Sequence, residues 1–551
     1  MKLHFVLVCL FLTTNCFSSE NKQSAISSAH PLATQAGFEI LEQGGNAFDA
    51  AIAVSAALAV VEPSGSGLGG GGFWLLHRAS DGVRTMIDGR EVAPNAAHQD
   101  MYLNNDGIVN KRLSLDGPLA AGIPGVPAAL AHLSNHYGRL TLKQSLAPAI
   151  RYAKQGFKVS KHFQKLAAFR VEALNQSTDS RAIFLQNGLV PNLGTLIIQS
   201  DLANTLEQLA QHGRDGFYKG NIAKQLVKSV QESGGIWTLQ DLQNYQIKER
   251  KPIISTYKGY TITSAALPSS GGIVLSSMLN QLEQLPLDNS DTSQRQHLIV
   301  EAMRRAYFDR SQLLGDADFI SVPTQKLTSK TYAKQLAASI DLHQATRNIA
   351  SENRHQNKGE DTTHFSIIDK EGNRVAATLS INYPFGSGFV AEGTGVLLND
   401  EMDDFSAHAG SANAYGLIGN EANAIAANKR PLSSMTPSFI ENDNRLMIIG
   451  TPGGSRIITM VLLGMLDFID GKDAKTIVSH PRFHHQYSPN KIQVESIGFT
   501  SKALNQLKQR GHEVDVLSRQ YGNMQVILQS KSSNKTTAAS DPRGEGYSDV
   551  R

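Results

Sequence analysis

The sequence predicts an α+β fold. Alanine-rich stretches at residues 33–41 and 47–61 are rich in helix formers and are separated by a Gly-Gly-Asn break, which predicts two packed helices. Residues 362–382 alternate in a period of two and contain a turn, which predicts a β-hairpin. Apolar residues at helical spacing predict further amphipathic helices at residues 142–156, 202–212 and 296–314.

Composition narrows the class of protein. The chain has 551 residues, of which 41% are hydrophobic and 18% charged, so it is expected to fold as a globular protein of one large or several ordinary domains. The formal net charge of +3 and the lack of basic runs interleaved with aromatics argue against nucleic acid as a partner. No internal apolar run is long enough to span a bilayer, so a small-molecule substrate is expected.

The N-terminus predicts export to the periplasm or the medium. Lys2 precedes an apolar run at residues 3–12, which is typical of a secretory signal peptide, here assigned to residues 1–18. Cys16 also suggests a lipoprotein signal, but Asn15 stands where such a signal needs a very small residue. Both cysteines of the chain, Cys9 and Cys16, fall within the segment removed. The mature protein is therefore expected to draw its chemistry from oxygen or nitrogen groups or from a metal.

The predicted hairpin places two hydroxyls opposite each other. Residues 370–372 fit a three-residue loop with Gly372 in the left-handed conformation. If Asp369 pairs with Asn373, then Thr362 faces Ser380, and Asn382 lies two residues further on the same face. A threonine at the mouth of a hairpin is a candidate nucleophile; a threonine-rich edge hairpin without a catalytic role is the alternative interpretation.

A glycine-rich stretch at residues 65–72 lies between a predicted helix and a predicted strand at residues 73–77. It matches the pattern G-x-G-x-x-G, but a dinucleotide site needs the strand first and the helix second. We therefore expect close backbone packing or a turn beside an active site.

Arg90 follows a short predicted strand at residues 84–87, a position suited to holding a carboxylate; a surface salt bridge to Asp88 or Glu91 is the alternative. Glu401, Asp403 and Asp404 lie within four residues but lack the EF-hand spacing of a calcium site. A pair of carboxylates that binds a substrate ammonium is the more specific hypothesis.

Further candidates lie in predicted loops and turns. Residues 408–427, around Tyr415, have the composition of a mobile loop, and residues 431–437 form a hydroxyl-bearing turn. Residues 451–456 open a predicted helix at 457–468, where backbone N–H groups are available to an oxyanion. The polar segment 342–360 is expected to be a flexible surface segment that ends just before Thr362. None of the 17 histidines forms H-E-x-x-H, and His484-His485 alone does not make a zinc site.

Taken together, these segments resemble the γ-glutamyltransferase family, also called glutathione hydrolases, of the N-terminal nucleophile superfamily. The resemblance covers essentially the whole mature chain. Its most specific motifs, in family order, are Asp361-Thr362-Thr363-His364, Asp403-Asp404-Phe405-Ser406, Arg430-Pro431-Leu432-Ser433-Ser434-Met435 and Gly450-Thr451-Pro452-Gly453-Gly454-Ser455-Arg456.

The resemblance implies a proenzyme that cleaves itself between Asp361 and Thr362. The large subunit would be residues 19–361 and the small, catalytic subunit residues 362–551, and the two would remain together as a heterodimer. The implied fold is the four-layer αββα sandwich of N-terminal nucleophile hydrolases, built jointly by both subunits.

The resemblance also implies a role for each candidate residue. Thr362 would be the nucleophile, with its free α-amine as general base and Ser380 adjusting its hydroxyl. The amides of Gly453 and Gly454 would form the oxyanion hole, and Tyr415 lies in the segment that resembles a lid. The substrate α-carboxylate would be held by Arg90, Ser433 and Ser434, and the α-ammonium by Asn382, Glu401 and Asp404. Some family members carry threonine in place of Ser380 and glutamine in place of Glu401.

The implied reaction transfers the γ-glutamyl group of glutathione or another γ-glutamyl compound to water, an amino acid or a peptide, without a cofactor or metal. Two alternatives remain. A related acylase would remove a dicarboxylic side chain from a β-lactam precursor, but it needs no ammonium site, which Glu401 and Asp404 provide. A non-enzymatic exported binding protein is the other alternative, and it predicts no internal cleavage.

Overall fold

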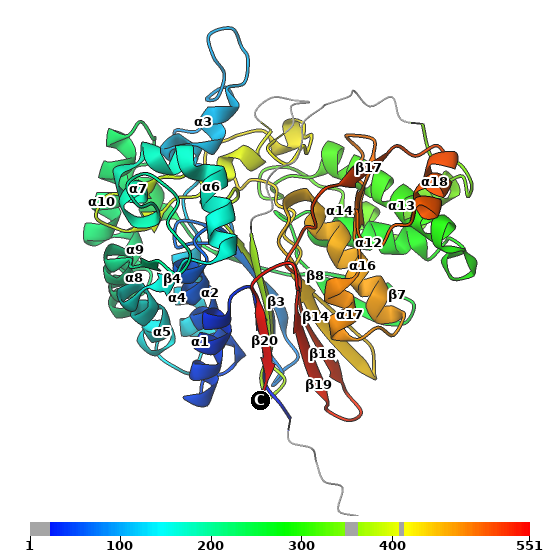
Figure 1. The fold of residues 1–551 in the computed structure, drawn as a ribbon, viewed down its shortest axis with the longest axis horizontal. Helices are drawn as coiled ribbons and strands as arrows, with labels where there is room; N and C mark the ends of the chain where they lie inside the picture. The colour runs from blue at the N-terminus through cyan, green and yellow to red at the C-terminus, as the bar shows by residue number, and fades with distance from the viewer. Residues whose placement is uncertain (1–21, 348–361, 407–412) are drawn as a thin grey trace, which may run out of the picture.

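The computed structural model describes residues 22–347, 362–406 and 413–551. The predicted signal peptide, Asp361 and most of the polar segment before it lie outside these residues. The chain is an α+β protein, as the sequence predicts, with two antiparallel sheets at its centre and helices on either side (Figure 1).

The larger sheet has seven strands, and its strand order mixes distant parts of the chain. All neighbouring strands are antiparallel. In spatial order they are β20 (Tyr547–Val550), β1 (Ala25–Ser28), β9 (Thr363–Ile368), β10 (Arg374–Ser380), β2 (Gly71–His77), β3 (Arg84–Gly89) and β6 (Lys248–Arg250).

The second sheet has six antiparallel strands. In spatial order they are β19 (Thr536–Ser540), β18 (Gln525–Ser530), β14 (Arg445–Gly450), β13 (Ser438–Glu441), β8 (Tyr260–Ser264) and β7 (Ile253–Tyr257). Strands β14 and β18 contact β9, and β14 also contacts β10, so the sheets pack on each other at the predicted hairpin.

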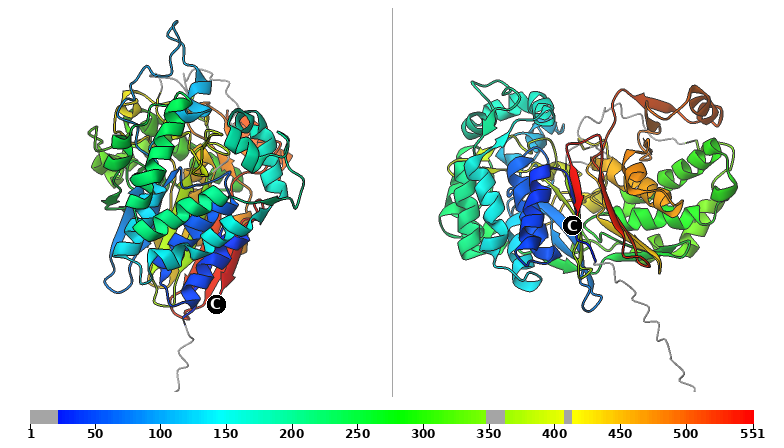
Figure 2. Two further views of the ribbon diagram at one scale, coloured as in Figure 1. Left: turned by 90° about the vertical axis from the view of Figure 1, so that its left-hand side faces the viewer. Right: turned by 60° about the horizontal axis from the view of Figure 1, so that its bottom comes forward.

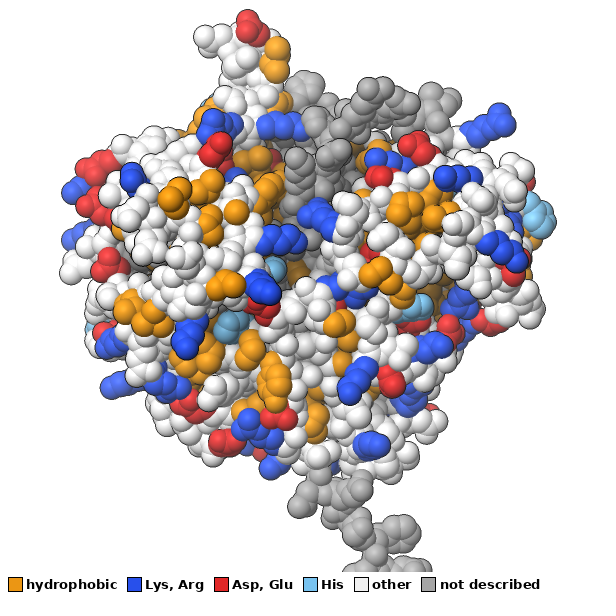
Figure 3. Space-filling model, in the orientation of Figure 1, with side chains coloured by type: hydrophobic (Ala, Val, Ile, Leu, Met, Phe, Trp, Pro, Cys, Tyr) orange, Lys and Arg blue, Asp and Glu red, His pale blue; other side chains and the backbone are white. Residues whose placement is uncertain are grey.

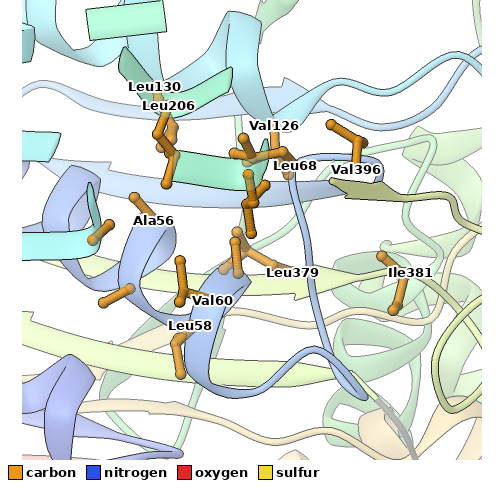
Figure 4. Close-up of a cluster of buried hydrophobic side chains, with 14 of the residues drawn as sticks. Ala56, Leu58, Val60, Leu68, Val126, Leu130, Leu206, Leu379, Ile381 and Val396 are labelled. Atoms are coloured by element: carbon orange, nitrogen blue, oxygen red, sulfur yellow. The ribbon is translucent and has the colours of Figure 1, made fainter. Parts of the chain in front are cut away.

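Helices cover the seven-stranded sheet on the side away from the second sheet (Figures 1 and 2). Helix α2 (Ala47–Val61) contacts β9 and β10 and packs against α1 (Pro31–Glu42) and α5 (Leu142–Gln155). All its residues are buried, and its alanines allow close approach of its neighbours. Asn46 and Asp49 form a capping box at its start. Figure 4 shows part of this core, to which Ala56, Leu58 and Val60 of α2 and Leu379 of β10 all contribute.

The six-stranded sheet is covered by helices from two separate stretches of sequence. Helix α12 (Gly271–Leu282) contacts β7 and β8, α16 (Ile457–Ile469) contacts β14, and α13 (Thr292–Leu313) packs on α12. The helices predicted at residues 296–314 and 457–468 are confirmed as α13 and α16, with bounds that shift by a few residues at most, whereas α12 was not predicted.

The remaining elements surround these layers. The helices are α3 (Lys111–Leu115), α4 (Val126–His136), α6 (Lys161–Gln176), α7 (Thr178–Phe184), α8 (Ser200–His212), α9 (Asp215–Tyr218), α10 (Gly220–Glu232), α11 (Leu239–Asn244), α14 (Thr324–Leu327), α15 (Lys330–Ala338), α17 (Ala474–Ser479) and α18 (Ser501–Gln509). The short strands are β4 (Phe157–Lys158), β5 (Leu196–Ile197), β11 (Val390–Ala391), β12 (Val396–Leu397), β15 (Phe483–His484), β16 (Ile492–Glu495) and β17 (Val514–Leu517). Single 3-10 turns are η1 (Pro118–Ala120), η2 (Leu287–Asn289), η3 (Glu401–Asp404), η4 (Glu421–Asn423) and η5 (Gly454–Arg456).

The predicted hairpin forms in the predicted register. Ile368 pairs with Arg374 and Thr363 with Leu379, so Thr362 and Ser380 follow in line at its open end. Gly372 has φ of 93°, as the loop interpretation requires. Because β9 and β10 are central strands, the hairpin does not lie at a sheet edge, where the alternative interpretation places it.

The glycine-rich stretch packs as expected. A Cβ added at Gly69 would overlap the Leu397 carbonyl, and one at Gly70 would overlap the Ser380 carbonyl. Only glycine lets this segment lie against the end of β10, which places it beside the candidate nucleophile.

Charged side chains of both signs are interspersed on the face shown in Figure 3. Within the described ranges, no helix is both long and apolar enough to cross a membrane.

Candidate active site

The candidate nucleophile lies at the open end of the hairpin. Thr362 immediately precedes β9, is buried, and its Oγ1 lies 3.3 Å from Ser380 Oγ. Ser380 Oγ also accepts a hydrogen bond of 2.8 Å from the Asn382 amide. This contact fixes the serine hydroxyl, and Asn382 takes the left-handed conformation, φ 73°, which asparagine tolerates better than most residues.

A small cavity adjoins Thr362 and brings nearly all the predicted site residues together. The predicted residues that line it are Arg90, Thr362, Ser380, Asn382, Glu401, Asp404, Tyr415, Ser433, Ser434 and Gly454. Gly453 is next to this set in sequence but is not among the lining residues. The pattern-based candidates thus converge from segments more than 300 residues apart in the chain.

Arg90 is fully buried and bridges the acidic residues of the cavity. Its Nη1 lies 2.7 Å from Glu401 Oε2, and its Nη2 lies 2.5 Å from Asp404 Oδ2. Nε donates to the Pro431 carbonyl at 3.2 Å, which anchors the guanidinium beside the serine turn. Arg90 Nη1 also lies 3.5 Å from Glu91 Oε2, but both side chains are buried, so the pairing considered with Glu91 is present and is not at the surface. The Asp88 carboxylate instead pairs with Arg250 at 2.8 Å.

The carboxylates in this region outnumber the nearby guanidinium. Burial raises the pKa of Glu401 to about 8, although Arg90 opposes the shift. Burial also raises the pKa of Glu91 well above its usual range, and the neighbouring Glu401 adds to the effect. Burial thus favours the neutral form of both Glu401 and Glu91 relative to exposed glutamates.

The Asp403 side chain makes different contacts from those of its two acidic neighbours in the same turn. It accepts hydrogen bonds of 2.8 Å from Ser114 Oγ and from the Ala414 amide. It therefore ties α3 and the segment before Tyr415 to the acidic turn, while Glu401 and Asp404 face the cavity.

Tyr415 lines the cavity and lies against the glycine turn. Its hydroxyl donates to the Asn382 carbonyl at 2.7 Å, and its ring lies where a Cβ on Gly454 would be. Gly454 has φ of 55° and Gly453 has φ of 136°, so both positions favour glycine for conformational reasons as well. Asn413 Nδ2 donates to Asp404 Oδ1 at 3.1 Å, which links the described part of the loop to the acidic residues.

The serine turn is held in place by a helix that the sequence motifs do not include. Ser434 Oγ accepts from Arg310 Nη2 at 3.1 Å, and Arg310 Nε donates to Ser270 Oγ at 3.0 Å. The sequence analysis did not identify Arg310 or Ser270, and it named Glu91 only as a possible salt-bridge partner of Arg90. The signal in the sequence that could have identified Arg310 is its place in a predicted helix, where the residues one turn before and one turn after it are apolar or aromatic.

No histidine of the described residues lines the cavity. His484 bonds to Thr459 and Gln486 through its two ring nitrogens. Among the described residues, His297, Glu301 and His512 offer metal-ligand atoms within 4.8 Å of one another. However, Arg304 and Arg305 already pair with Glu301, at 3.1 and 2.7 Å, and their charges oppose binding of a divalent cation there.

Known proteins are similar in sequence to this chain over most of its length. Residues 33–550 match the family model described as gamma-glutamyltranspeptidase. The chain is 42% identical over 529 residues to the glutathione hydrolase proenzyme of Escherichia coli (strain K12), covering 95% of this chain and 90% of the relative. It is 35% identical to the glutathione hydrolase proenzyme of Bacillus subtilis (strain 168), covering 92% and 88%.

Solved structures are similar as well. The cephalosporin acylase from Bacillus halodurans matches with a TM-score of 0.85 at 27% identity, covering 96% of each chain. The Helicobacter pylori gamma-glutamyltranspeptidase matches with a TM-score of 0.56 at 42% identity, covering 57% of this chain and 90% of that one. The match of the family model over almost the whole chain, together with these identities, shows that the chain belongs to the gamma-glutamyltranspeptidase family.

Proposed function

We propose that this protein is a γ-glutamyltransferase proenzyme that hydrolyses glutathione and related γ-glutamyl amides or transfers their γ-glutamyl group to amino acids and peptides. The observation that carries the proposal is the position of Thr362, whose Oγ1 lies 3.3 Å from Ser380 Oγ beside a cavity lined by one arginine, two acids and four serines. Family membership supports the same activity.

The proposed reaction begins with cleavage before Thr362. The hydroxyl of Thr362 attacks the Asp361 carbonyl, which breaks the peptide bond, frees the α-amine of Thr362 and leaves an ester between the two residues. Water then hydrolyses this ester, which releases the Asp361 carboxylate and restores the Thr362 hydroxyl. An α-amine has a pKa of about 8, so it can accept the hydroxyl proton near neutral pH without a histidine. Thr362 then attacks the γ-carbonyl of the donor, the amine leaves, and water or an acceptor amine releases the γ-glutamyl group.

Recognition of the donor follows from the charges in the cavity. A γ-glutamyl group carries an α-carboxylate and an α-ammonium. Arg90, Ser433 and Ser434 are proposed to hold the carboxylate, and Glu401, Asp404 and Asn382 the ammonium. The amides of Gly453 and Gly454 are proposed to stabilise the oxyanion, a contribution typically of ~3 kcal/mol for each donor.

The two-subunit organisation is also part of the proposal. Residues 19–361 form the large subunit and residues 362–551 the small one, which together build the four-layer αββα sandwich of N-terminal nucleophile hydrolases. The sheet composition supports this view: β1, β2, β3 and β6 share a sheet with β9, β10 and β20. Since each sheet takes strands from both subunits, the cleaved halves are expected to remain associated.

Export completes the proposed maturation. A signal peptide of residues 1–18 directs the precursor to the periplasm or the medium, where it acts after removal of the signal. Loss of Cys9 and Cys16 with this segment leaves a thiol-free enzyme, which suits a nucleophile that is a hydroxyl.

Replacing the nucleophile tests the proposal. Thr362→Ala should leave an uncut chain close to 60 kDa, without release of aniline from a γ-glutamyl anilide. Thr537→Ala, which alters an exposed threonine of β19, is the matched control and should give two bands and normal activity. N-terminal sequencing of the smaller wild-type band should begin at Thr362. Two subunits in the Thr362→Ala variant would contradict the mechanism.

An acylase activity is the second candidate, because a cephalosporin acylase matches the structure with a TM-score of 0.85. The acidic pair favours the first candidate, because a glutaryl side chain has no ammonium to bind. Assaying a γ-glutamyl anilide beside a glutaryl anilide separates the two. We expect at least tenfold preference for the γ-glutamyl donor, and the reverse preference would support the acylase.

A further inference from the structure

Arg310 is a buried cation without a carboxylate partner. It lies on α13, its side chain is almost completely buried, and no carboxylate in the described part of the chain comes within ion-pair distance of its guanidinium. The neighbouring arginines of the same helix, Arg304 and Arg305, both pair with Glu301. A buried charge without an opposite charge beside it is costly unless hydrogen bonds compensate for the lost hydration, so the hydrogen bonds of Arg310 account for its presence here.

The hydrogen bonds of Arg310 lead to the cavity. Its Nη2 donates to Ser434 Oγ at 3.1 Å, and its Nε donates to Ser270 Oγ at 3.0 Å. Ser270 Oγ in turn donates to the Ser433 carbonyl at 2.7 Å, and the Ser270 amide donates to the same carbonyl at 2.8 Å. Arg310 therefore holds both residues of the serine turn, one directly and one through Ser270.

The hydrogen bond from Arg310 determines whether the Ser434 hydroxyl acts as a donor or as an acceptor toward the cavity. Since its oxygen accepts from Arg310, the hydroxyl proton is free to be donated elsewhere. Ser434 lines the cavity, and no acceptor for this proton is found among the described residues. A substrate carboxylate in the cavity supplies such an acceptor, and the charge of Arg310 behind the hydroxyl strengthens that hydrogen bond.

We propose that Arg310 is a positioning residue that orients the Ser434 hydroxyl toward the α-carboxylate of the donor and makes the enzyme selective for donors with a free α-carboxylate. The inference rests on the proposed function, because it assigns the serine turn to the carboxylate. In the proposed mature enzyme, Arg310 comes from the large subunit and Ser434 from the small one, so the carboxylate subsite needs both.

Two donors separate this role from general damage to the site. One is a γ-glutamyl anilide with a free α-carboxylate, and the other is the same anilide with an α-carboxamide. In Arg310→Gln the glutamine amide still offers donors, but the charge is lost. We expect the KM for the carboxylate donor to rise roughly tenfold, with kcat changed less than about threefold and the KM for the carboxamide donor nearly unchanged.

Controls and a second variant keep the inference falsifiable. Arg295→Gln alters an arginine of the same helix that pairs with Asp470 at the surface, and it should leave both donors unaffected. Subunit cleavage and the thermal midpoint report whether each variant folds. If Arg310→Gln is not cleaved, Arg310→Lys decides the question: its single ammonium cannot serve Ser270 and Ser434 in the same fork geometry, so selectivity should fall to an intermediate value.

Equal losses for both donors, or unchanged selectivity in a cleaved variant, would overturn the role of Arg310. A wild-type enzyme that releases no aniline from the carboxylate donor would instead overturn the proposed function itself. The two failures are therefore distinguishable in one set of assays.

Discussion

Arg90 Nη1 lies 2.7 Å from Glu401 Oε2, so the residue proposed to hold a carboxylate is already paired with a residue proposed to hold an ammonium. Asp404, also proposed to hold the ammonium, is paired with the same arginine, because its Oδ2 lies 2.5 Å from Arg90 Nη2. A zwitterionic α-amino acid group can replace these internal pairs with pairs of its own, one for each charge. A ligand with only one of the two charges leaves a buried group unpaired, which costs binding energy.

Arg90→Lys tests this exchange while preserving the positive charge opposite Glu401 and Asp404. Lysine cannot make the forked contacts of a guanidinium, so the KM for a γ-glutamyl anilide should rise roughly 10- to 100-fold. Cleavage of the precursor does not need substrate recognition and should proceed normally on a denaturing gel. Arg84→Lys, which alters an arginine paired with Glu441, is the control for the substitution itself. Parallel loss of cleavage and activity in Arg90→Lys would argue against a role in recognition.

The pKa of Glu401 predicts a pH dependence of ligand binding. Burial raises this pKa to about 8, so the carboxyl group is largely protonated at pH 6.5 and ionises as the pH rises through 8. An ammonium ligand binds the ionised form better. The inhibition constant of L-glutamate should therefore fall by roughly tenfold between pH 6.5 and 8.5, and Glu401→Gln should flatten the profile.

Glutarate provides the matched ligand for this experiment, because it lacks the ammonium. Its inhibition should weaken over the same pH range as the negative charge on Glu401 develops. Inhibition constants, rather than kcat, are the proper readout, since the α-amine of Thr362 is expected to titrate near the same pH and affects the chemical step. Identical L-glutamate profiles for the wild type and Glu401→Gln would show that another group is responsible.

The hairpin and the site differ in how far the sequence determines them. The register of β9 and β10 follows from local rules, because the loop glycine and the alternation of residues leave one pairing that fits both. The resemblance to the family locates Arg90, Glu401 and Ser434, but it does not indicate that Arg90 pairs with the acids, because ion pairs depend on distances between remote segments.

Arg310 shows more clearly which contacts cannot be predicted from the sequence. A helix of 22 residues with both polar and apolar side chains predicts that some arginine faces inward, but not which hydroxyl it meets. That contact depends on how α13 and α12 pack beside the serine turn, a tertiary relationship with no local signature. The same holds for Tyr415, whose ring lies against Gly454 across 39 residues of sequence.

Gly454→Ala should disable the site through a steric effect that a second mutation relieves in part. An added methyl group overlaps the ring of Tyr415, and φ of 55° disfavours alanine independently. We expect kcat to fall by at least tenfold, because the oxyanion turn must shift. Gly471→Ala is the matched control: its φ is 85°, and no atom lies within 4 Å of the added carbon, so it tests conformational strain without a clash.

The double variant Gly454→Ala/Tyr415→Ala removes the ring that causes the overlap. If the clash is the main defect, the double variant should regain several-fold in kcat relative to Gly454→Ala. The comparison should be made with the Tyr415→Ala single variant, because the ring also contributes a hydrogen bond to the Asn382 carbonyl. Additive losses would instead assign the defect to backbone strain alone.

Glu441 predicts how the assembled protein responds to acid. It pairs with Arg84 at 2.5 Å, Arg374 at 3.1 Å and Lys531 at 2.7 Å, and so links the proposed large subunit to the small one. Burial opposes its ionisation, but the three cations outweigh burial and lower its pKa to about 2. The unfolded chain therefore binds the proton at higher pH than the folded protein does. The stabilisation is complete above a pH of about 4.5 and is lost as the pH falls toward 2.

Glu441→Gln should lower the thermal midpoint at pH 7, and the difference from the wild type should shrink below pH 4. The exposed pair of Glu371 with Arg139 is the control, since Glu371→Gln should change the midpoint little at pH 7. Thermal unfolding followed by circular dichroism from pH 2.5 to 7 measures both differences. A Glu441→Gln deficit that stays constant across this range would rule out the ionised carboxylate as its source.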